Sequence, residues 1–292
     1  MSNTKRRIGK MKNAKKIFDS RKARILGFVC CMIFSLNQAV ISQQLFLLAG
    51  QSNAVGQGDS SKSNGNVCNN AYEYDVLLDS IKILKDPAGQ NWKSLETTNK
   101  GGTILPAFSK TLNRLTQEKV VVIMAARGGS SCSKYAELDN YGTWDTTGKL
   151  FAEAVEKINK AIIKSGIPLT SIIWMQGERD ANAISDGKES AETFRTALEN
   201  LIKRFRDIYG KKLPFLIVQT GYQSGRPKAG NDKVREIQAT VAKTTKRVYV
   251  VYEDTNLFLE RNWMKDNVHY NQEGLNDIGE KVAQYVFNYL IK

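Results

Sequence analysis

Five short apolar runs constrain the fold more than any other feature of this sequence. They begin at Gln44 (QLFLLAG), Val120 (VVVIMAARG), Ser171 (SIIWMQG), Pro214 (PFLIVQTG) and Val248 (VYVVYED). Each run is rich in aliphatic and β-branched side chains and lacks polar alternation, which is typical of a strand buried on both faces of a parallel sheet. We therefore expect these runs to be the strands of one mostly parallel sheet.

Amphipathic stretches lie between the apolar runs. The stretch FAEAVEKINKAIIKSG, 151–166, places apolar residues at helical spacing and ends on Gly166, which suits a helix C-cap. Similar patterns cover 190–210, 231–247 and 274–292. Strands that alternate with helices predict an open α/β sheet with helices on both faces.

The stretch 59–104 departs from this alternation. It is rich in Asn, Ser, Gly and Lys, and we expect a short hairpin around Tyr72–Leu84 within an elaborate surface excursion. No internal repeat and no interdomain linker stands out in the chain. Residues 43–292 are therefore predicted to form a single domain.

The first 42 residues have the pattern of a secretory signal peptide. Residues 1–24 hold ten Lys and Arg and one acid, an uninterrupted apolar run covers 25–36, and small residues follow at Ala39 and Ser42. The apolar run is shorter than the about 20 residues of a membrane-spanning helix. We predict a secreted protein, periplasmic or extracellular, with a retained signal anchor as the alternative and the membrane as a partner only in that case.

The net charge of +14 comes mostly from this N-terminal segment. The remaining residues contain 33 basic and 28 acidic side chains. A nucleic-acid-binding arm is a weaker interpretation of the N-terminal segment, because such an arm has no need of an apolar run behind it. The distribution therefore predicts no nucleic-acid partner.

Outside the first 42 residues the chain has two cysteines, Cys68 and Cys132. Export permits a disulfide between them, and two free thiols are an equally good interpretation. Two cysteines and a single histidine do not make a zinc site. We expect no metal and no cofactor.

Polar, glycine-rich motifs follow three of the predicted strands. The first apolar run ends in GQSNA, the second in ARGGSSC and the third in WMQGERD. In open α/β sheets ligands bind beyond the carboxyl ends of the strands. We therefore expect these three motifs to line one site.

Ser52, between Gln51 and Asn53, is the candidate nucleophile. A serine needs a base to take its proton, and His269 is the only histidine of the chain. Asp266, three residues earlier, can orient the imidazole as the acid of a Ser-His-Asp triad does. The alternatives are a structural histidine and a solvated loop acid.

An acyl-transfer site also needs hydrogen-bond donors for the negative oxygen of the tetrahedral intermediate. The candidates are the Ser52 N–H, the backbone at Gly128 or Gly129, where glycine permits close approach, and the side-chain amide of Gln176. A Gly-Gly turn and a strand-end amide that satisfies loop carbonyls are the ordinary interpretations of the last three.

Two acids, Glu178 and Asp180, lie beside the candidate amide in WMQGERD. Paired carboxylates also occur in glycoside hydrolases. A carboxylate next to a developing oxyanion would oppose it, so we expect supporting roles, such as holding Gln51 or Arg127. A phosphate-binding loop is not indicated, because GQGDS lacks the lysine of that motif.

Four sequence blocks resemble the ordered blocks of the SGNH hydrolase superfamily. They are GQSN around Ser52, GGSS from Gly128, WMQGERD from Trp174 and DNVH from Asp266. More narrowly, they resemble its carbohydrate-esterase branch, with the sialate O-acetylesterase-like domain and carbohydrate esterase family six, which includes acetyl xylan esterases. The blocks occur in the family's order and span 50–269.

This resemblance implies a three-layer, flavodoxin-like fold without a metal. It implies that Ser52 is the nucleophile, His269 its base and Asp266 the acid that orients the base. It also implies an oxyanion hole formed by the Ser52 N–H, a glycine of GGSS and Gln176. Ser130 stands where the family often has threonine, which is a small change.

The expected function is that of a serine esterase that removes acetyl groups from carbohydrate hydroxyls. An exported domain of 250 residues suits the xylan-type esterase, so the expected partner is acetylated xylan or a related plant polysaccharide. A sialate O-acetylesterase is the alternative within the same class. A non-catalytic carbohydrate-binding protein on a hydrolase fold is the alternative from another class.

Overall fold

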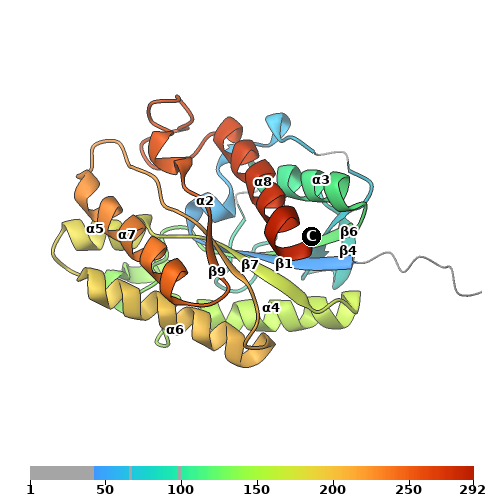
Figure 1. The fold of residues 1–292 in the computed structure, drawn as a ribbon, viewed down its shortest axis with the longest axis horizontal. Coiled ribbons are helices and arrows are strands. Elements are labelled where there is room, and N and C mark those ends of the chain that lie inside the picture. Colours follow the sequence, from blue (N-terminus) through green and yellow to red (C-terminus); the bar gives the residue numbers. More distant parts are fainter. Residues whose placement is uncertain (1–42, 66–67, 98–99) are drawn as a thin grey trace, which may run out of the picture. The chain divides into compact units, whose positions relative to one another are not determined.

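The computed structural model describes residues 43–65, 68–97 and 100–292, and a seven-stranded sheet lies at its centre (Figure 1). The strand order is β4-β3-β6-β1-β7-β8-β9, and the neighbours are parallel except for the antiparallel pair β3 and β4. The predicted signal peptide lies outside the described residues. The strands are β1 (Gln43–Gly50), β3 (Ala71–Asp75), β4 (Ser80–Ile83), β6 (Lys119–Ala126), β7 (Leu169–Met175), β8 (Phe215–Val218) and β9 (Val248–Tyr252).

All five apolar runs form strands of this sheet, which confirms the α/β fold class. They become β1, β6, β7, β8 and β9, and their order in space, counted along the chain, is 2-1-3-4-5. This is the flavodoxin-like doubly wound order. The chain goes first to one side of β1 and then to the other. The switch point, where such folds bind ligands, therefore falls at the carboxyl end of β1.

Helices cover both faces of the sheet (Figure 1). One apolar cluster joins α3 and α8 to one face, and a second joins α4, α5, α6 and α7 to the other. Strand β1 serves both, because Leu45 and Leu47 face the second cluster while Phe46 and Leu48 face the first. The helices are α2 (Ser52–Val55), α3 (Leu105–Thr116), α4 (Leu150–Ser165), α5 (Glu178–Ser185), α6 (Ala191–Tyr209), α7 (Lys228–Thr244) and α8 (Gln272–Val286).

Short elements complete the fold. The predicted cap of α4 is present, since Gly166 has the left-handed φ of 70°. The short elements are the paired strands β2 (Gly58–Asp59) and β5 (Gly101–Gly102), the 3₁₀ turns η1 (Ser60–Lys62), η2 (Lys134–Ala136), η3 (Asp139–Tyr141) and η4 (Asp254–Leu257), and the terminal π-helical turn η5 (Phe287–Ile291).

The irregular segment before α3 contributes more to the core than a surface excursion would. The expected hairpin is present as β3 and β4, but β3 also pairs in parallel with β6 and so joins the main sheet. Ala71 and Tyr74 are each 1% exposed. The sequence does not reveal this pairing, because short strands carry little periodic signal.

Cys68 and Cys132 are both free thiols, so the structure favours that interpretation over a disulfide. Cys132 is buried, and burial raises the pKa of its thiol. Within the described ranges, every helix is too short or too polar to cross a lipid bilayer.

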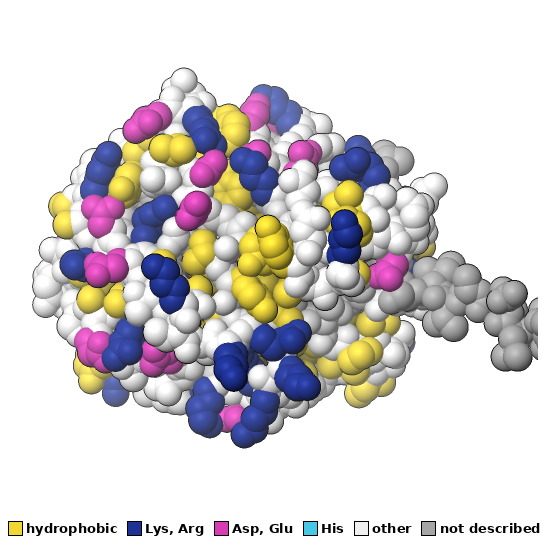
Figure 2. Space-filling model, in the orientation of Figure 1, with side chains coloured by type: hydrophobic (Ala, Val, Ile, Leu, Met, Phe, Trp, Pro, Cys, Tyr) yellow, Lys and Arg dark blue, Asp and Glu magenta, His cyan; other side chains and the backbone are white. Residues whose placement is uncertain are grey.

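Acidic and basic side chains are interspersed over the face shown in Figure 2, with a group of Lys and Arg at its lower edge. A hollow near the amino ends of β7 and β8 is lined by Leu169, Tyr209, Lys212 and Arg247, among others. These strand ends lie at the opposite edge of the sheet from the polar motifs. The hollow is therefore separate from the predicted site.

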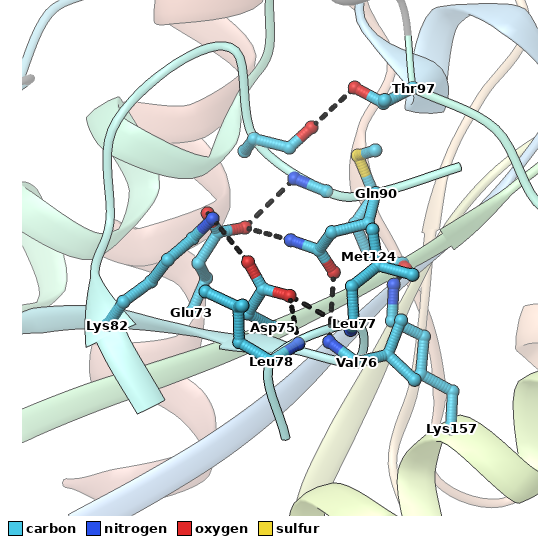
Figure 3. A network of polar contacts seen from close by, with 12 residues as sticks. Glu73, Asp75, Val76, Leu77, Leu78, Lys82, Gln90, Thr97, Met124 and Lys157 are labelled. Atoms are coloured by element: carbon cyan, nitrogen blue, oxygen red, sulfur yellow. Dashed lines mark hydrogen bonds and ion pairs between the residues drawn. The ribbon is translucent and has the colours of Figure 1, made fainter. Parts of the chain in front are cut away.

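A buried polar network lies where β3, β4 and α4 meet (Figure 3). Lys82 Nζ lies 3.2 Å from Glu73 Oε1 and 2.7 Å from Asp75 Oδ2. Lys157, fully buried on α4, donates a hydrogen bond of 2.8 Å to the Met124 carbonyl. Glu73, Asp75, Lys82 and Lys157 are called the edge network below.

Candidate active site

Ser52 is the first residue of α2, directly beyond the carboxyl end of β1, and is 7% exposed. The turn before it requires glycine. Gly50 has a φ of 142°, and a Cβ at this position would lie 2.0 Å from the Met175 carbonyl oxygen of β7. The sequence GQSN thus places the serine at the switch point between β1 and β7.

Gln51 fastens this turn to the WMQGERD motif. Its side-chain oxygen accepts hydrogen bonds of 3.2 Å from the N–H groups of Gly177 and Arg179. Its own N–H donates to the Met175 carbonyl at 3.0 Å. The amide before Ser52 therefore positions the end of β1 against the end of β7.

Asn53 fastens the same turn to the segment that carries His269. Its Oδ1 accepts from the Tyr270 N–H at 3.1 Å, and its Nδ2 lies 3.4 Å from the Val268 carbonyl. The same Nδ2 donates to Glu178 Oε1 at 2.7 Å. One side chain thus contacts the backbone on both sides of His269.

His269 and Asp266 form a pair in the loop that leads into α8, where the sequence places them. His269 Nδ1 lies 2.8 Å from Asp266 Oδ2. Asp266 Oδ1 accepts from the N–H groups of Val268 and His269, both at 2.8 Å. Partial burial raises the pKa of Asp266, but these hydrogen bonds outweigh it and bring the pKa below its usual value. The acid is therefore a carboxylate that orients the imidazole.

Asn53, the neighbour of Ser52, thus links the turn at the end of β1 to the segment that carries His269. In the described part of the chain, no hydrogen bond joins Ser52 Oγ to the imidazole. Catalytic hydrogen bonds in unliganded sites are often long and tighten only when substrate binds.

Of the two glycines in GGSS, Gly128 lies beside Ser52. A Cβ on Gly128 would lie 3.9 Å from Ser52 Cβ and 2.9 Å from Glu96 Oε2. The Gly128 N–H donates to the same Glu96 oxygen at 2.7 Å. Gly129 instead supplies the turn, with a φ of 69°, and a Cβ there would lie 2.6 Å from the ring of Tyr141.

Gln176 lies at the carboxyl end of β7 with 1% of its surface exposed. Its Nε2 donates to Asp180 Oδ2 and lies 3.4 Å from the Ser130 carbonyl. Its backbone carbonyl accepts from Gln238 Nε2 at 2.9 Å. The amide thus lies against the GGSS block, held by acceptors of the protein itself.

Asp180 connects α5 to the same loop. Its carboxylate accepts from the N–H groups of Cys132 and Ser133, each at 3.0 Å at the nearest oxygen. Burial raises the pKa of Asp180 and the pKa of Glu189. The negative charge of Asp180 raises the pKa of Glu189 further. Asp180 therefore fixes both Gln176 and the backbone beyond GGSS.

Glu178 is 4% exposed and lies behind Asn53. The Tyr270 hydroxyl lies 3.5 Å from the same oxygen that Asn53 contacts. Burial raises the pKa of Glu178.

Sequence reasoning overlooked two residues at this site, Glu96 and Tyr141. Glu96 Oε1 pairs with Arg127 Nη1 at 2.5 Å. Arg127 also donates to the Asn140 carbonyl at 3.0 Å, and the adjacent Tyr141 is 48% exposed over Gly129. Glu96 lies in an irregular segment and Tyr141 ends the short turn η3. Neither segment carries a motif, so no local signal identifies these residues.

Three solved structures share the fold. One is a protein from Arabidopsis thaliana, with a TM-score of 0.65 at 22% identity over 84% of this chain and 98% of that chain. The second is NanS, with a TM-score of 0.59 at 14% identity over 85% of this chain and 98% of that chain. The third is a carbohydrate acetylesterase from Xanthomonas citri, with a TM-score of 0.57 at 18% identity over 84% of this chain and 56% of that chain.

Sequence comparisons identify the family. A probable carbohydrate esterase of Arabidopsis thaliana is 28% identical over 265 residues, 84% of this chain and 91% of the relative. The family model described as carbohydrate esterase, sialic acid-specific acetylesterase, matches residues 42–288. This match confirms the resemblance seen in the four sequence blocks. The chain therefore belongs to this family of carbohydrate esterases and is a hydrolase of the carbohydrate acetylesterase class.

Proposed function

We propose that this protein is a serine O-acetylesterase with a Ser52-His269-Asp266 triad, acting on acetylated xylan or a related plant polysaccharide. One observation carries the assignment of the triad. Asn53, next to Ser52, contacts the backbone on both sides of His269, whose ring is oriented by Asp266. A binding protein without catalysis has no need of such an arrangement.

In the proposed reaction, Ser52 Oγ attacks the acetyl carbonyl carbon while His269 Nε2 takes the hydroxyl proton. The carbonyl oxygen becomes negative and accepts from the N–H groups of Gly128 and Ser52 and from the side-chain amide of Gln176. The intermediate then releases the sugar oxygen, which takes the proton from the imidazole. An acetyl group remains on the serine. A water molecule, deprotonated by the same imidazole, attacks it and releases acetate.

Acetylated sialic acid is the second candidate substrate, and the description of the matching family favours it. The two candidates share the acetyl-transfer chemistry and differ in the sugar. Acetate release from acetylated xylan, acetylated sialic acid, acetylated pectin and a small aryl acetate separates them. Acetylated xylan should give the largest kcat/KM. A larger kcat/KM on acetylated sialic acid would identify sialic acid, and not xylan, as the sugar of the substrate.

The nucleophile is tested with Ser52→Ala, His269→Ala and the double variant. Because the two side chains act as a unit, all three variants should lose esterase activity to a similar extent, about 10⁶-fold in kcat. A serine-directed organophosphonate should label the wild type once, at Ser52, as read by peptide mass spectrometry. Labelling of Ser130 or Ser131, or near-normal turnover by Ser52→Ala, would overturn the assignment.

We also propose that the protein is exported. Its basic and apolar N-terminal pattern supports cleavage near Ala39 or Ser42. N-terminal sequencing of the exported protein tests this, and an intact Met1 in a membrane fraction would identify a retained anchor instead.

A further inference from the structure

The carboxylate of Glu96 bridges two groups beside the candidate nucleophile. One oxygen accepts from the Gly128 N–H at 2.7 Å, and the other pairs with Arg127 Nη1 at 2.5 Å. The N–H belongs to the glycine that lies against Ser52. In this structure, therefore, an anion already occupies the donor that the proposed reaction assigns to the acetyl oxygen.

The two groups that hold this carboxylate are themselves positioned by other contacts. The Arg127 N–H donates to the Gly50 carbonyl at 3.1 Å, which ties the end of β6 to the turn before Ser52. Arg127 Nη2 donates to the Asn140 carbonyl at 3.0 Å. Within the described residues, Arg127 Nε is buried and has no hydrogen-bond partner. Both the backbone and the guanidinium of Arg127 are thus held by carbonyl groups of the protein.

Glu96, by contrast, is free to be displaced. Its side chain is 33% exposed, whereas Glu178 and Asp180 are almost completely buried. A partly exposed ion pair competes with water and is weak. Rotation of the Glu96 side chain would expose a carboxylate to solvent without leaving a buried charge in the protein.

We propose that Arg127 and the Gly128 N–H form a subsite for the oxygens of the acetyl group and of product acetate, and that Glu96 occupies this subsite until substrate displaces it. This inference rests on the proposed function. The carboxylate of Glu96 has the same two oxygens as acetate, and its contacts show where that product fits. A cation beside the Gly128 N–H also stabilises the negative oxygen of the tetrahedral intermediate.

The first test measures the second-order rate of organophosphonate labelling at Ser52 in Glu96→Gln and Glu96→Ala. The phosphoryl oxygen needs the same donor as the acetyl oxygen. A weak ion pair that leaves the subsite open in about a tenth to a third of molecules predicts a rise of about three- to tenfold in the labelling rate when the occupant is removed. Glu96→Gln should lie between the wild type and Glu96→Ala, because a neutral amide still accepts from the N–H but does not pair with Arg127.

The second test measures inhibition by acetate, with an aryl acetate as substrate. Acetate should inhibit Glu96→Ala at concentrations about three- to tenfold below those needed for the wild type, because the vacated guanidinium and N–H accept a carboxylate. Glu260→Gln, which removes an exposed carboxylate elsewhere, is the matched control and should behave as the wild type.

The outcomes separate this inference from the proposed function. A labelling rate that falls, or stays within about twofold, in Glu96→Ala shows that Glu96 merely aligns the Arg127–Gly128 peptide, and overturns the inference. Unchanged acetate inhibition overturns it as well. Failure of the wild type itself to be labelled at Ser52 would instead overturn the proposed function.

Discussion

The edge network and the acids behind Ser52 are both buried clusters of carboxylates, but different groups stabilise their charge. In the edge network, Lys82 pairs with Glu73 and Asp75, and Lys157 lies nearby (Figure 3). The second cluster is called the site network here, and among the described residues no Lys or Arg pairs with its acids. It consists of Gln51, Asn53, Gln176, Glu178 and Asp180.

The acids of the site network are held by neutral donors. Asp180 accepts from two backbone N–H groups and the Gln176 amide, and Glu178 accepts from the Asn53 amide. In the part of the chain that the structure describes, neither acid forms an ion pair with Lys or Arg. Burial raises the pKa of both, as it also does for Glu73 of the edge network despite the nearby Lys82. Hydrogen bonds of this kind specify direction more strictly than a point charge does.

The two networks therefore have different roles. The opposite charges of the edge network stabilise the place where the hairpin of β3 and β4 joins the sheet. The neutral donors of the site network position the turn that carries Ser52 and the loop beyond GGSS. We therefore expect substitutions in the site network to change turnover, and substitutions in the edge network to change stability.

The largest loss of kcat is expected for Asp266→Asn, and the losses in the two networks are compared with it. The asparagine amide would favour the wrong tautomer of His269, and kcat should fall about 10⁴-fold, as for a triad aspartate. Steady-state kinetics on an aryl acetate checks this, with thermal unfolding as the control for folding. A loss below about tenfold would remove Asp266 from the triad.

Asp180→Asn should have the next largest effect, about 10²-fold in kcat with little change in KM. The new amide N–H₂ would face Gln176 Nε2, so two donors would oppose each other and displace the Gln176 amide that we propose for the oxyanion hole. Loss of one oxyanion donor costs at least this much. An unchanged kcat would show that Asp180 has no part in positioning the site.

The same variant should change the pH dependence of stability. Because burial raises the pKa of Asp180, the native state keeps a proton that the unfolded state releases above about pH 4. Stability therefore falls as the pH rises from about 4 towards neutral, and Asp180→Asn should reduce this fall. Urea unfolding at a series of pH values measures it.

Glu178→Gln should reduce kcat only about tenfold. The glutamine Oε1 can still accept from Asn53 Nδ2, so the main loss is the extra strength of a hydrogen bond to a charged acceptor. A loss as large as that of Asp266→Asn would show that Glu178 takes part in the chemistry rather than in support.

Lys157→Met should have the smallest effect on turnover, with kcat within about twofold of the wild type, since distant sites act independently. Its effect should appear in stability. Burial lowers the pKa of Lys157 to about 8, so the native state holds fewer protons than the unfolded state between pH 8 and 10.5. Stability should rise with pH across this window in the wild type and not in the variant. A large loss of kcat would contradict the division between the two networks.

Much of the fold was predictable because the relevant signals are local. The five apolar runs become strands, and Gly166 ends α4 where the pattern places it. Two features were not anticipated. Helix α5 begins at Glu178, inside the WMQGERD motif. The expected hairpin joins the main sheet, because β3 pairs with β6. Backbone pairing between distant segments has no periodic pattern in either partner.

For the site, the sequence specifies which chemistry is available and at which strand ends it lies. The local features are Gly50 in the turn before Ser52, the single histidine His269, and Asp266 three residues before that histidine. The strand ends are also local, because a strand buried on both faces must end where its apolar run ends. The partners of the two amides beside Ser52 come from the tertiary structure. So does the contact of Glu96 with Gly128, which joins residues 32 positions apart, and that of Asp180 with Cys132, 48 apart. Such contacts form only after the strands have brought their loops to one edge of the sheet, because loop residues far apart in the chain carry no pattern that announces their neighbours.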